Sequence, residues 1–127
     1  MTPDSLVDFC LALPQAIETF PFGEETSVFK TSGNGKIFAL SALAADRFAV
    51  SLKCDPDEGR ALREEFPSHI TTGYHLNKKH WITIVLDGFV PDEVVEQLLT
   101  DSHALVRPRV PRAPRGSAAP ASPQRDG

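Results

Sequence analysis

The sequence lacks several features that mark whole classes of proteins. Its 127 residues contain no apolar run near the 18 or so residues that a membrane-spanning helix needs, so we expect no membrane partner. Cys10 and Cys54 are the only cysteines, too few for a disulfide framework. Residues 1–9 are acidic and lack the basic segment of a secretory signal. These absences predict a reduced, cytoplasmic protein.

Positive charge is scarce in most of the chain. The formal net charge is -4, but residues 1–106 hold eight Lys and Arg against sixteen Asp and Glu, a net charge of -8. Residues 107–127 hold five Arg and one Asp, a net charge of +4. Because phosphate binding needs positive surface, an acidic body disfavours a large nucleic-acid-binding face. Any such binding must depend on a local group of lysines or on the basic tail.

The composition changes at residue 107 and divides the chain in two. Residues 107–127 hold five of the eleven prolines and almost no large apolar residue, so this segment cannot bury enough surface to offset the entropy of ordering. We expect a disordered Arg/Pro-rich tail there, which is either a solvated terminus or a weak electrostatic arm. Residues 1–106 are long enough for one domain with a single modest core.

Periodicity and turn residues predict the order of elements. Thr2-Pro3, Asp55-Pro56 and Val90-Pro91 each open a helix. Strands are expected at residues 27–31, 36–42, 47–53, 69–72 and 80–86, which alternate in polarity or are rich in β-branched side chains. Residues 16–22 receive no assignment. Because turns join neighbouring strands, the fold class should be α+β, a two-layer sandwich of a mostly antiparallel sheet with three helices on one side.

The densest polar cluster is residues 73–81, GYHLNKKHW. Lys78 and Lys79 could hold phosphate while Tyr74, His80 or Trp81 stacks on bases. The alternative is a solvated β-turn whose tip carries the lysines and whose aromatic residues belong to the core.

Chemistry at the two histidines of this cluster is disfavoured. His75 and His80 are five positions apart, which places them on one face of neither a helix nor a strand. No acidic residue or cysteine lies beside them to complete a metal site. No nucleophile motif accompanies them for acid–base catalysis.

Two other features have structural explanations that we prefer. The Phe20-Pro21-Phe22 segment could line a binding groove, but such a segment more often packs a loop over a sheet. Cys54 precedes a helix N-terminus, which can lower a thiol pKa, but a buried and inert cysteine is the better interpretation.

Five segments in order, together with three residues near the end, resemble the MmcQ/YjbR family. The match covers most of residues 1–107, and its most specific motif is residues 73–81. Thr72 stands where the family commonly has Pro, and Ile82 where it commonly has Asn. The matching residues are Glu18-Thr19-Phe20-Pro21-Phe22-Gly23, Val28-Phe29-Lys30, Gly35-Lys36-Ile37-Phe38-Ala39, Leu52-Lys53-Cys54-Asp55-Pro56 with Leu62-Arg63, the 73–81 motif, and Ser102 with Leu105-Val106.

The resemblance implies a compact fold with an antiparallel sheet, described as CyaY-like or secretion-chaperone-like, and DNA binding through a likeness to double-wing folds. We expect a non-enzymatic DNA-binding protein with no cofactor, metal site or catalytic residue. The alternative is a module that binds a protein or small ligand through the Phe20–Phe22 segment and the Tyr74–Trp81 loop. The candidate nucleic-acid contacts are Lys30, Lys36, Lys53, Tyr74, His75, Asn77, Lys78, Lys79 and His80.

Overall fold

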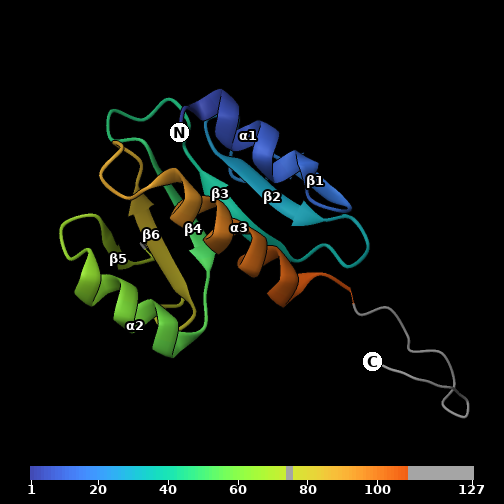
Figure 1. Cartoon of the computed structure of the whole chain (residues 1–127). Coiled ribbons are helices and arrows are strands. Elements are labelled where there is room, and N and C mark those ends of the chain that lie inside the picture. The colour runs from blue at the N-terminus through green and yellow to red at the C-terminus, as the bar shows by residue number, and fades with distance from the viewer. Residues whose placement is uncertain (74–75, 109–127) are drawn as a thin grey trace, which may run out of the picture.

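The computed structural model describes residues 1–73 and 76–108. Its sheet has six strands in the order β1-β2-β3-β4-β6-β5, and every neighbouring pair is antiparallel. The strands are β1 (Ala16–Thr19), β2 (Ser27–Thr31), β3 (Ile37–Ser41), β4 (Ala49–Lys53), β5 (Ile70–Thr72) and β6 (Trp81–Val85). The helices are α1 (Pro3–Ala12), α2 (Pro56–Glu65) and α3 (Asp92–Val106). This architecture confirms the predicted α+β sandwich (Figure 1).

Local capping explains where the helices begin. The Thr2 hydroxyl accepts a hydrogen bond from the Ser5 backbone N–H at 3.1 Å, and Pro3 occupies the first turn of α1, where a missing N–H costs nothing. The Asp55 carboxylate accepts from the N–H groups of Asp57 and Glu58 at the start of α2. In the part of the chain that the structure describes, no helix is both long enough and apolar enough to cross a membrane.

The register of the strands separates a core face from an open face. Val50 pairs with Ile84, and both belong to the hydrophobic core, so the residues that alternate with them point the other way. All three helices pack on the core face. Figure 1 shows α1 and α3 crossing it, with α2 beside β5. The core is built from Leu6 and Cys10 of α1, Val95 and Leu99 of α3, and Phe29, Phe38, Leu52 and Ile82 of the sheet.

Ser102 joins α3 to the middle of the sheet. The ladder between β3 and β4 pairs only Ala39 with Leu52 and Leu40 with Ser51. Beyond it, the Ser102 hydroxyl accepts from the Lys53 backbone N–H at 2.9 Å and donates to the Phe38 carbonyl at 2.6 Å. A side chain from the helix therefore replaces hydrogen bonds that the two strands do not make with each other.

Two details differ from the sequence-based expectations. Residues Ala16–Thr19, which received no assignment, form the edge strand β1. Trp81 is buried, at 8% exposure, but it lies opposite Lys53 on the open face, not in the core beneath the helices. The tail expected to be disordered lies, from residue 109 onward, outside the described residues.

Candidate nucleic-acid interface

All five lysines of the chain lie at one end of the sheet. Strands β2 and β4 end there, and Lys30 is the last residue but one of β2 while Lys53 is the last residue of β4. Strand β3 begins there after Lys36, and β6 begins there after the loop that carries Lys78 and Lys79. We call these five residues the lysine end. They are scattered in the sequence, and the alternating strand direction of an antiparallel sheet brings them to one edge.

Two of these lysines project from the open face of the sheet. Lys30 pairs with Ile17 on β1 and Ile37 on β3, and Lys53 pairs with Trp81 on β6. Both side chains are half-buried, so their aliphatic stems lie along the sheet while their amines reach water. The Lys53 Nζ lies 5.9 Å from the centre of the Trp81 ring, a cation–π contact.

The loop before β6 presents the next two lysines in a turn that Asn77 holds. The Asn77 side-chain oxygen accepts from the Lys79 N–H at 2.9 Å, and its carbonyl accepts from the N–H groups of His80 and Trp81. Lys78, Lys79 and His80 are exposed. The His80 carbonyl accepts from the Cys54 N–H at 2.7 Å, which fixes the loop beside Lys53.

The structure therefore brings together seven of the nine predicted contacts. Lys30, Lys36 and Lys53 join Asn77, Lys78, Lys79 and His80 at this end. The other two, Tyr74 and His75, lie outside the described residues. Within residues 1–73 and 76–108, no group of three or more His, Cys, Asp or Glu side chains is placed to bind a metal ion.

The lysine amines have no carboxylate partner within residues 1–73 and 76–108. The ion pairs found among the described residues join Met1 to Asp92, Arg60 to Asp57, and His69 to Asp87. Each lysine of this end is therefore available to an anion without first breaking an ion pair.

Negative charge is concentrated in the helical layer. The three helices and the Asp55 cap carry eleven carboxylates and two arginines, whereas the remaining strands and loops up to residue 106 carry five carboxylates and six Lys and Arg. Glu18 is the one carboxylate in the six strands, and it pairs with Phe29, which points toward the helices. No strand carboxylate therefore lies on the open face, from which lysines project. Most of the net charge of -8 lies on the helical side of the sheet.

Cys54 lies beside Lys53 in a surface cavity, and its side chain is buried. The cavity has a volume of about 360 Å³ and is lined by Lys53, Cys54, Asp55, Pro56, His80 and Leu105. Burial and, to a lesser degree, the neighbouring Glu58 carboxylate together raise the pKa of the Cys54 thiol to about 12. A thiol with that pKa is protonated at neutral pH and is a poor nucleophile. The burial of Cys54 agrees with the prediction of a buried cysteine.

The Phe20–Phe22 segment and residues 76–81, the described part of the Tyr74–Trp81 loop, do not line a common groove. The first segment follows the edge strand β1, and it lies at the end of the sheet where β2 begins. The described part of the second, residues 76–81, precedes β6 at the opposite end and near the opposite edge. The two segments occupy diagonal corners of the sheet, so that form of the ligand-binding alternative is wrong.

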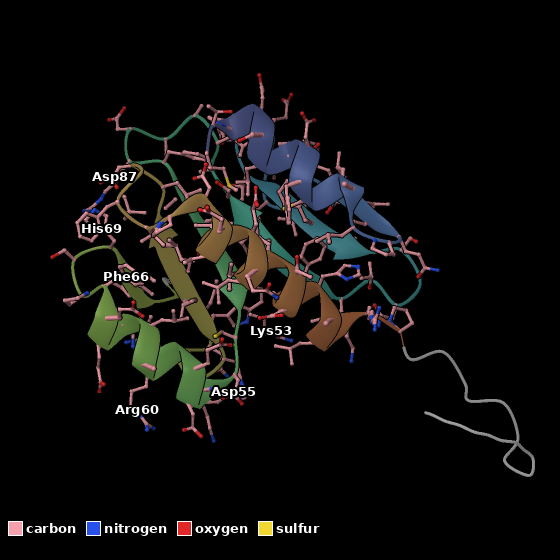
Figure 2. The ribbon with its side chains drawn as sticks, viewed as in Figure 1. Lys53, Asp55, Arg60, Phe66, His69 and Asp87 are labelled. Atoms are coloured by element: carbon pink, nitrogen blue, oxygen red, sulfur yellow. The ribbon has the colours of Figure 1, made fainter. Side chains whose placement is uncertain are left out.

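A histidine–carboxylate pair at the far end of the sheet was not predicted. The His69 Nε2 lies 2.9 Å from an Asp87 carboxylate oxygen, and the His69 ring stacks on Phe89 with centroids 4.4 Å apart. The Phe89 N–H and the His69 ring, in that order, hold the pKa of Asp87 below its ordinary value by donating to the carboxylate. Figure 2 shows this pair far from Lys53 and Asp55.

This pair is not arranged for acid–base catalysis. The second ring nitrogen of His69, Nδ1, is buried and has no hydrogen-bond partner among the described residues. A general base must present its free nitrogen to substrate, and this one faces the protein interior. The separation of 18 positions between His69 and Asp87 explains why no local pattern in the sequence signalled the contact.

Relatives of this chain share both its sequence and its fold. It is 38% identical over 96 residues to the uncharacterized protein YbdF of Escherichia coli O157:H7, covering 76% of each chain. It is 33% identical over 103 residues to the uncharacterized protein YjbR of Escherichia coli strain K12, covering 81% of this chain and 85% of the relative. These names state no activity.

Solved structures show the same arrangement of strands and helices. The crystal structure of Deinococcus radiodurans protein DR2400, which carries the family domain DUF419, superposes with a TM-score of 0.78 at 46% identity, over 82% of this chain and 77% of that one. A Pseudomonas syringae protein gives a TM-score of 0.73 at 27% identity, over 84% of this chain and 100% of that one. The YjbR family model matches residues 11–105, and the chain therefore belongs to the YjbR family.

Proposed function

We propose that this chain is a non-enzymatic DNA-binding protein whose lysine end contacts the phosphates of duplex DNA. The observation that carries the proposal is the gathering of every lysine at one end of the sheet. A body with a net charge of -8 can hold a polyanion only through such a local positive surface. The lack of carboxylate partners for these lysines, among the residues described, favours the same use.

The dimensions of the lysine end suit a nucleic-acid backbone. Strands β2, β3, β4 and β6 are consecutive neighbours in the sheet, and adjacent strands lie about 4.8 Å apart. The row of lysines therefore spans about 14 Å, the axial rise of roughly four nucleotides in one strand of B-DNA. Up to five phosphate contacts are within reach of one docked duplex.

The contacts should be made mainly to the backbone. Of the aromatic side chains exposed among the described residues, Phe20, Phe22 and Phe89 lie at the other end of the sheet, and the His80 imidazole is the one at the lysine end. Trp81 is buried beneath Lys53, so it offers no stacking surface. The acidic helices face away from the lysines' open face and are poor candidates for entering a groove. Phosphate contacts position a protein but carry no sequence information, so we expect weak sequence preference.

A binding role without catalysis is supported by the state of the reactive groups. The Cys54 thiol has a pKa of about 12, and the free nitrogen of His69 is buried. Both cysteines are free, which suits a reducing compartment such as the cytoplasm, where DNA is also accessible.

The test is a titration of labelled DNA, followed by fluorescence anisotropy, at several salt concentrations. A duplex of about 24 base pairs should bind with a log–log salt slope near -4.5, since each of five phosphate contacts contributes about 0.9. Replacing two exposed lysines in the variant K78A/K79A should reduce this slope by about 1.8 and weaken binding most at low salt.

The matched control is the variant R47A/R60A. It makes the same change in net charge at two exposed arginines, one in the β3–β4 loop at the far end of the sheet and one on α2. Its slope should stay close to that of the unmodified chain. Equal losses in the two variants would mean that only net charge matters. Absence of binding to duplex and single strands at low salt would refute the proposal.

A further inference from the structure

A cleft opens between α2 and α3 where the chain passes from β4 to α2. α3 packs on β3 and β4, whereas α2 packs on β5, and β6 lies between β4 and β5 in the sheet. Figure 1 shows β6 between the two helices. The cleft consists of two cavities, of about 360 and 140 Å³, whose shared lining residues are Lys53, Cys54, Asp55 and Leu105. The larger volume lies within the range of pockets that hold small molecules.

The bottom of the cleft is buried and surrounded by negative charge. Cys54 is 4% exposed, which makes it the most deeply buried of the shared lining residues. After burial itself, the carboxylates of Glu58, Asp55 and Asp101 raise the pKa of its thiol. Glu58 and Asp101 line the smaller cavity from opposite sides, because one belongs to α2 and the other to α3.

Both of these carboxylates can accept further hydrogen bonds. Glu58 accepts from the Cys54 thiol through one oxygen at 3.6 Å, and Asp101 accepts from Gln97 through one oxygen at 2.9 Å. Because a carboxylate offers about four acceptor positions on its two oxygens, each retains capacity for an ammonium group placed between the helices.

Positive charge lines the mouth of the same cleft. Lys53 lines both cavities and the exposed His80 lines the larger one. Figure 2 shows Lys53 and Asp55 between α2 and the C-terminal turns of α3. Within residues 1–73 and 76–108, Lys53 forms no ion pair with a carboxylate of the cleft. Charges of both signs therefore line one cavity without neutralising each other.

The surface between these charges is apolar. Leu98, Ala104 and Leu105 of α3 line the smaller cavity, and Pro56 lines the larger one. Leu105 is 58% exposed, so a ligand with an aliphatic body would remove apolar surface of this side chain from water, which favours binding.

We propose that this cleft binds a small linear zwitterion, with an ammonium group and a carboxylate at opposite ends of an aliphatic body, as in an ω-amino acid. The ammonium lies between Glu58 and Asp101, the body lies against Leu105, and the carboxylate lies beside Lys53 and His80. The inference does not depend on DNA binding, because the ligand and the carboxylates that hold it are different.

The mixed charges explain why a ligand with a single charge fits less well. A carboxylate alone meets the repulsion of three carboxylates, and an ammonium alone leaves Lys53 without a partner and repels it. A zwitterion satisfies both ends of the cleft. Its charges also cancel, so its binding should depend only weakly on salt, unlike the binding of a polyanion.

The experiment uses three compounds that share one aliphatic chain. 6-Aminohexanoate carries both charges, hexylamine carries only the ammonium, and hexanoate carries only the carboxylate. Each is titrated into the isotope-labelled full-length chain while amide chemical shifts are recorded. 6-Aminohexanoate should shift the amides of Cys54, Glu58 and Asp101. It should also bind at least about tenfold more tightly than either other compound, because it makes both sets of charge-assisted hydrogen bonds.

Two charge variants assign the ends of the ligand. Asp101→Asn should weaken the binding of 6-aminohexanoate and hexylamine but not of hexanoate, whereas Lys53→Gln should weaken 6-aminohexanoate and hexanoate but not hexylamine. The matched control is Glu93→Gln, which removes an exposed carboxylate from the first turn of α3, outside the cleft. It should bind all three compounds like the unmodified chain.

A third variant fills the cleft without changing its charge. Leu105→Trp should abolish the binding of 6-aminohexanoate, because the larger side chain occupies the space of the aliphatic body. Leu11→Trp makes the same change at a leucine of α1 that is 42% exposed and should have no effect. Circular dichroism melting confirms that both variants are folded.

Several results would overturn the inference while leaving the DNA proposal in place. One is the absence of shifts at the three amides with 6-aminohexanoate. Another is equal affinity for hexylamine, which would make the cleft a site for organic cations. Equal affinity for hexanoate would reduce it to an anion contact of the lysine end. Undiminished binding by Leu105→Trp would place the ligand elsewhere on the molecule.

Discussion

At one end of the sheet five lysines have no carboxylate partner among the described residues, while the other end holds two contacts between opposite charges. His69 contacts Asp87 there, and the N-terminal amine contacts Asp92 at 3.0 Å. The exposed rings of Phe20, Phe22 and Phe89, at 49%, 68% and 64% exposure, also belong to that end. The same six strands thus terminate in two different surfaces, one cationic and one aromatic and acidic.

The difference separates charges that stabilise the fold from charges that are left for a partner. A paired carboxylate such as Asp87 fixes a loop within the protein. An unpaired lysine on a sheet face contributes little to the free energy of folding, because exposed charges are well solvated. Substitutions at equivalent places near the two ends should therefore have unequal effects, and that inequality can be measured.

The largest expected difference is between two phenylalanines. Phe38 is fully buried, and its ring lies 5.2 Å from His103 and 6.4 Å from Phe29, so Phe38→Ala should cost about 3–5 kcal/mol of unfolding free energy. Phe89 is 64% exposed, so Phe89→Ala should cost about 1 kcal/mol, the worth of its aromatic contacts. Urea unfolding measures both. Similar costs would contradict the assignment of the core to the helix side of β3.

A smaller difference is expected between two buried serines that bridge β3 and β4. Ser102 makes two hydrogen bonds near Lys53, whereas Ser41 makes one, to the Ala49 carbonyl, near the far end. Each buried partner left unsatisfied costs about 1–3 kcal/mol. We therefore expect about 3 kcal/mol for Ser102→Ala and about 1 kcal/mol for Ser41→Ala.

Hydrogen exchange provides a second readout for this pair. Ser102→Ala should speed exchange of the Lys53 amide, whose acceptor it removes, and Ser41→Ala should leave that amide protected. If Ser102→Ala neither destabilises the protein nor exposes that amide, the helix does not complete the sheet at the lysine end.

Local sequence patterns were sufficient to predict most of the elements. Alternation in residues 47–53 and β-branched residues in 80–86 predicted β4 and β6, because a half-buried strand must alternate. The edge strand β1 was not predicted, because its four residues, AIET, are too few to show a periodic pattern. The side of the sheet on which Trp81 lies depends on its register with Lys53, which composition does not reveal.

The arrangement of the candidate site depends on topology and was beyond the sequence. The lysines could be named one by one, yet their meeting at one edge follows from the strand order β1-β2-β3-β4-β6-β5. The same order places the Phe20–Phe22 segment at a diagonal corner, so the predicted shared groove was wrong. The contact between His69 and Asp87 joins the loops before β5 and after β6, and no spacing rule links those positions.

The smallest effect concerns pH and belongs to the end with paired charges. Hydrogen bonds from the Phe89 N–H and then from His69 hold the pKa of Asp87 below its ordinary value. A carboxylate whose pKa is lower in the folded state than in the unfolded state stabilises the fold. This stabilisation is fully present above the unfolded-state pKa, about 3.9. That contribution is lost as the pH falls through the lower folded pKa.

Asp87→Asn should therefore reduce stability at neutral pH and flatten the acid side of the stability profile below about pH 4. Urea midpoints across that range, with Asp46→Asn as the control, measure the effect. Asp46 is exposed in the β3–β4 loop near the same end and makes no side-chain hydrogen bond within the described residues. Binding of duplex DNA should be unchanged in Asp87→Asn, because the substitution lies far from every lysine. If the urea midpoints of Asp87→Asn and of the unmodified chain change in parallel with pH, the charge of Asp87 does not stabilise the fold. A change in DNA affinity would show that the two ends of the sheet are not independent.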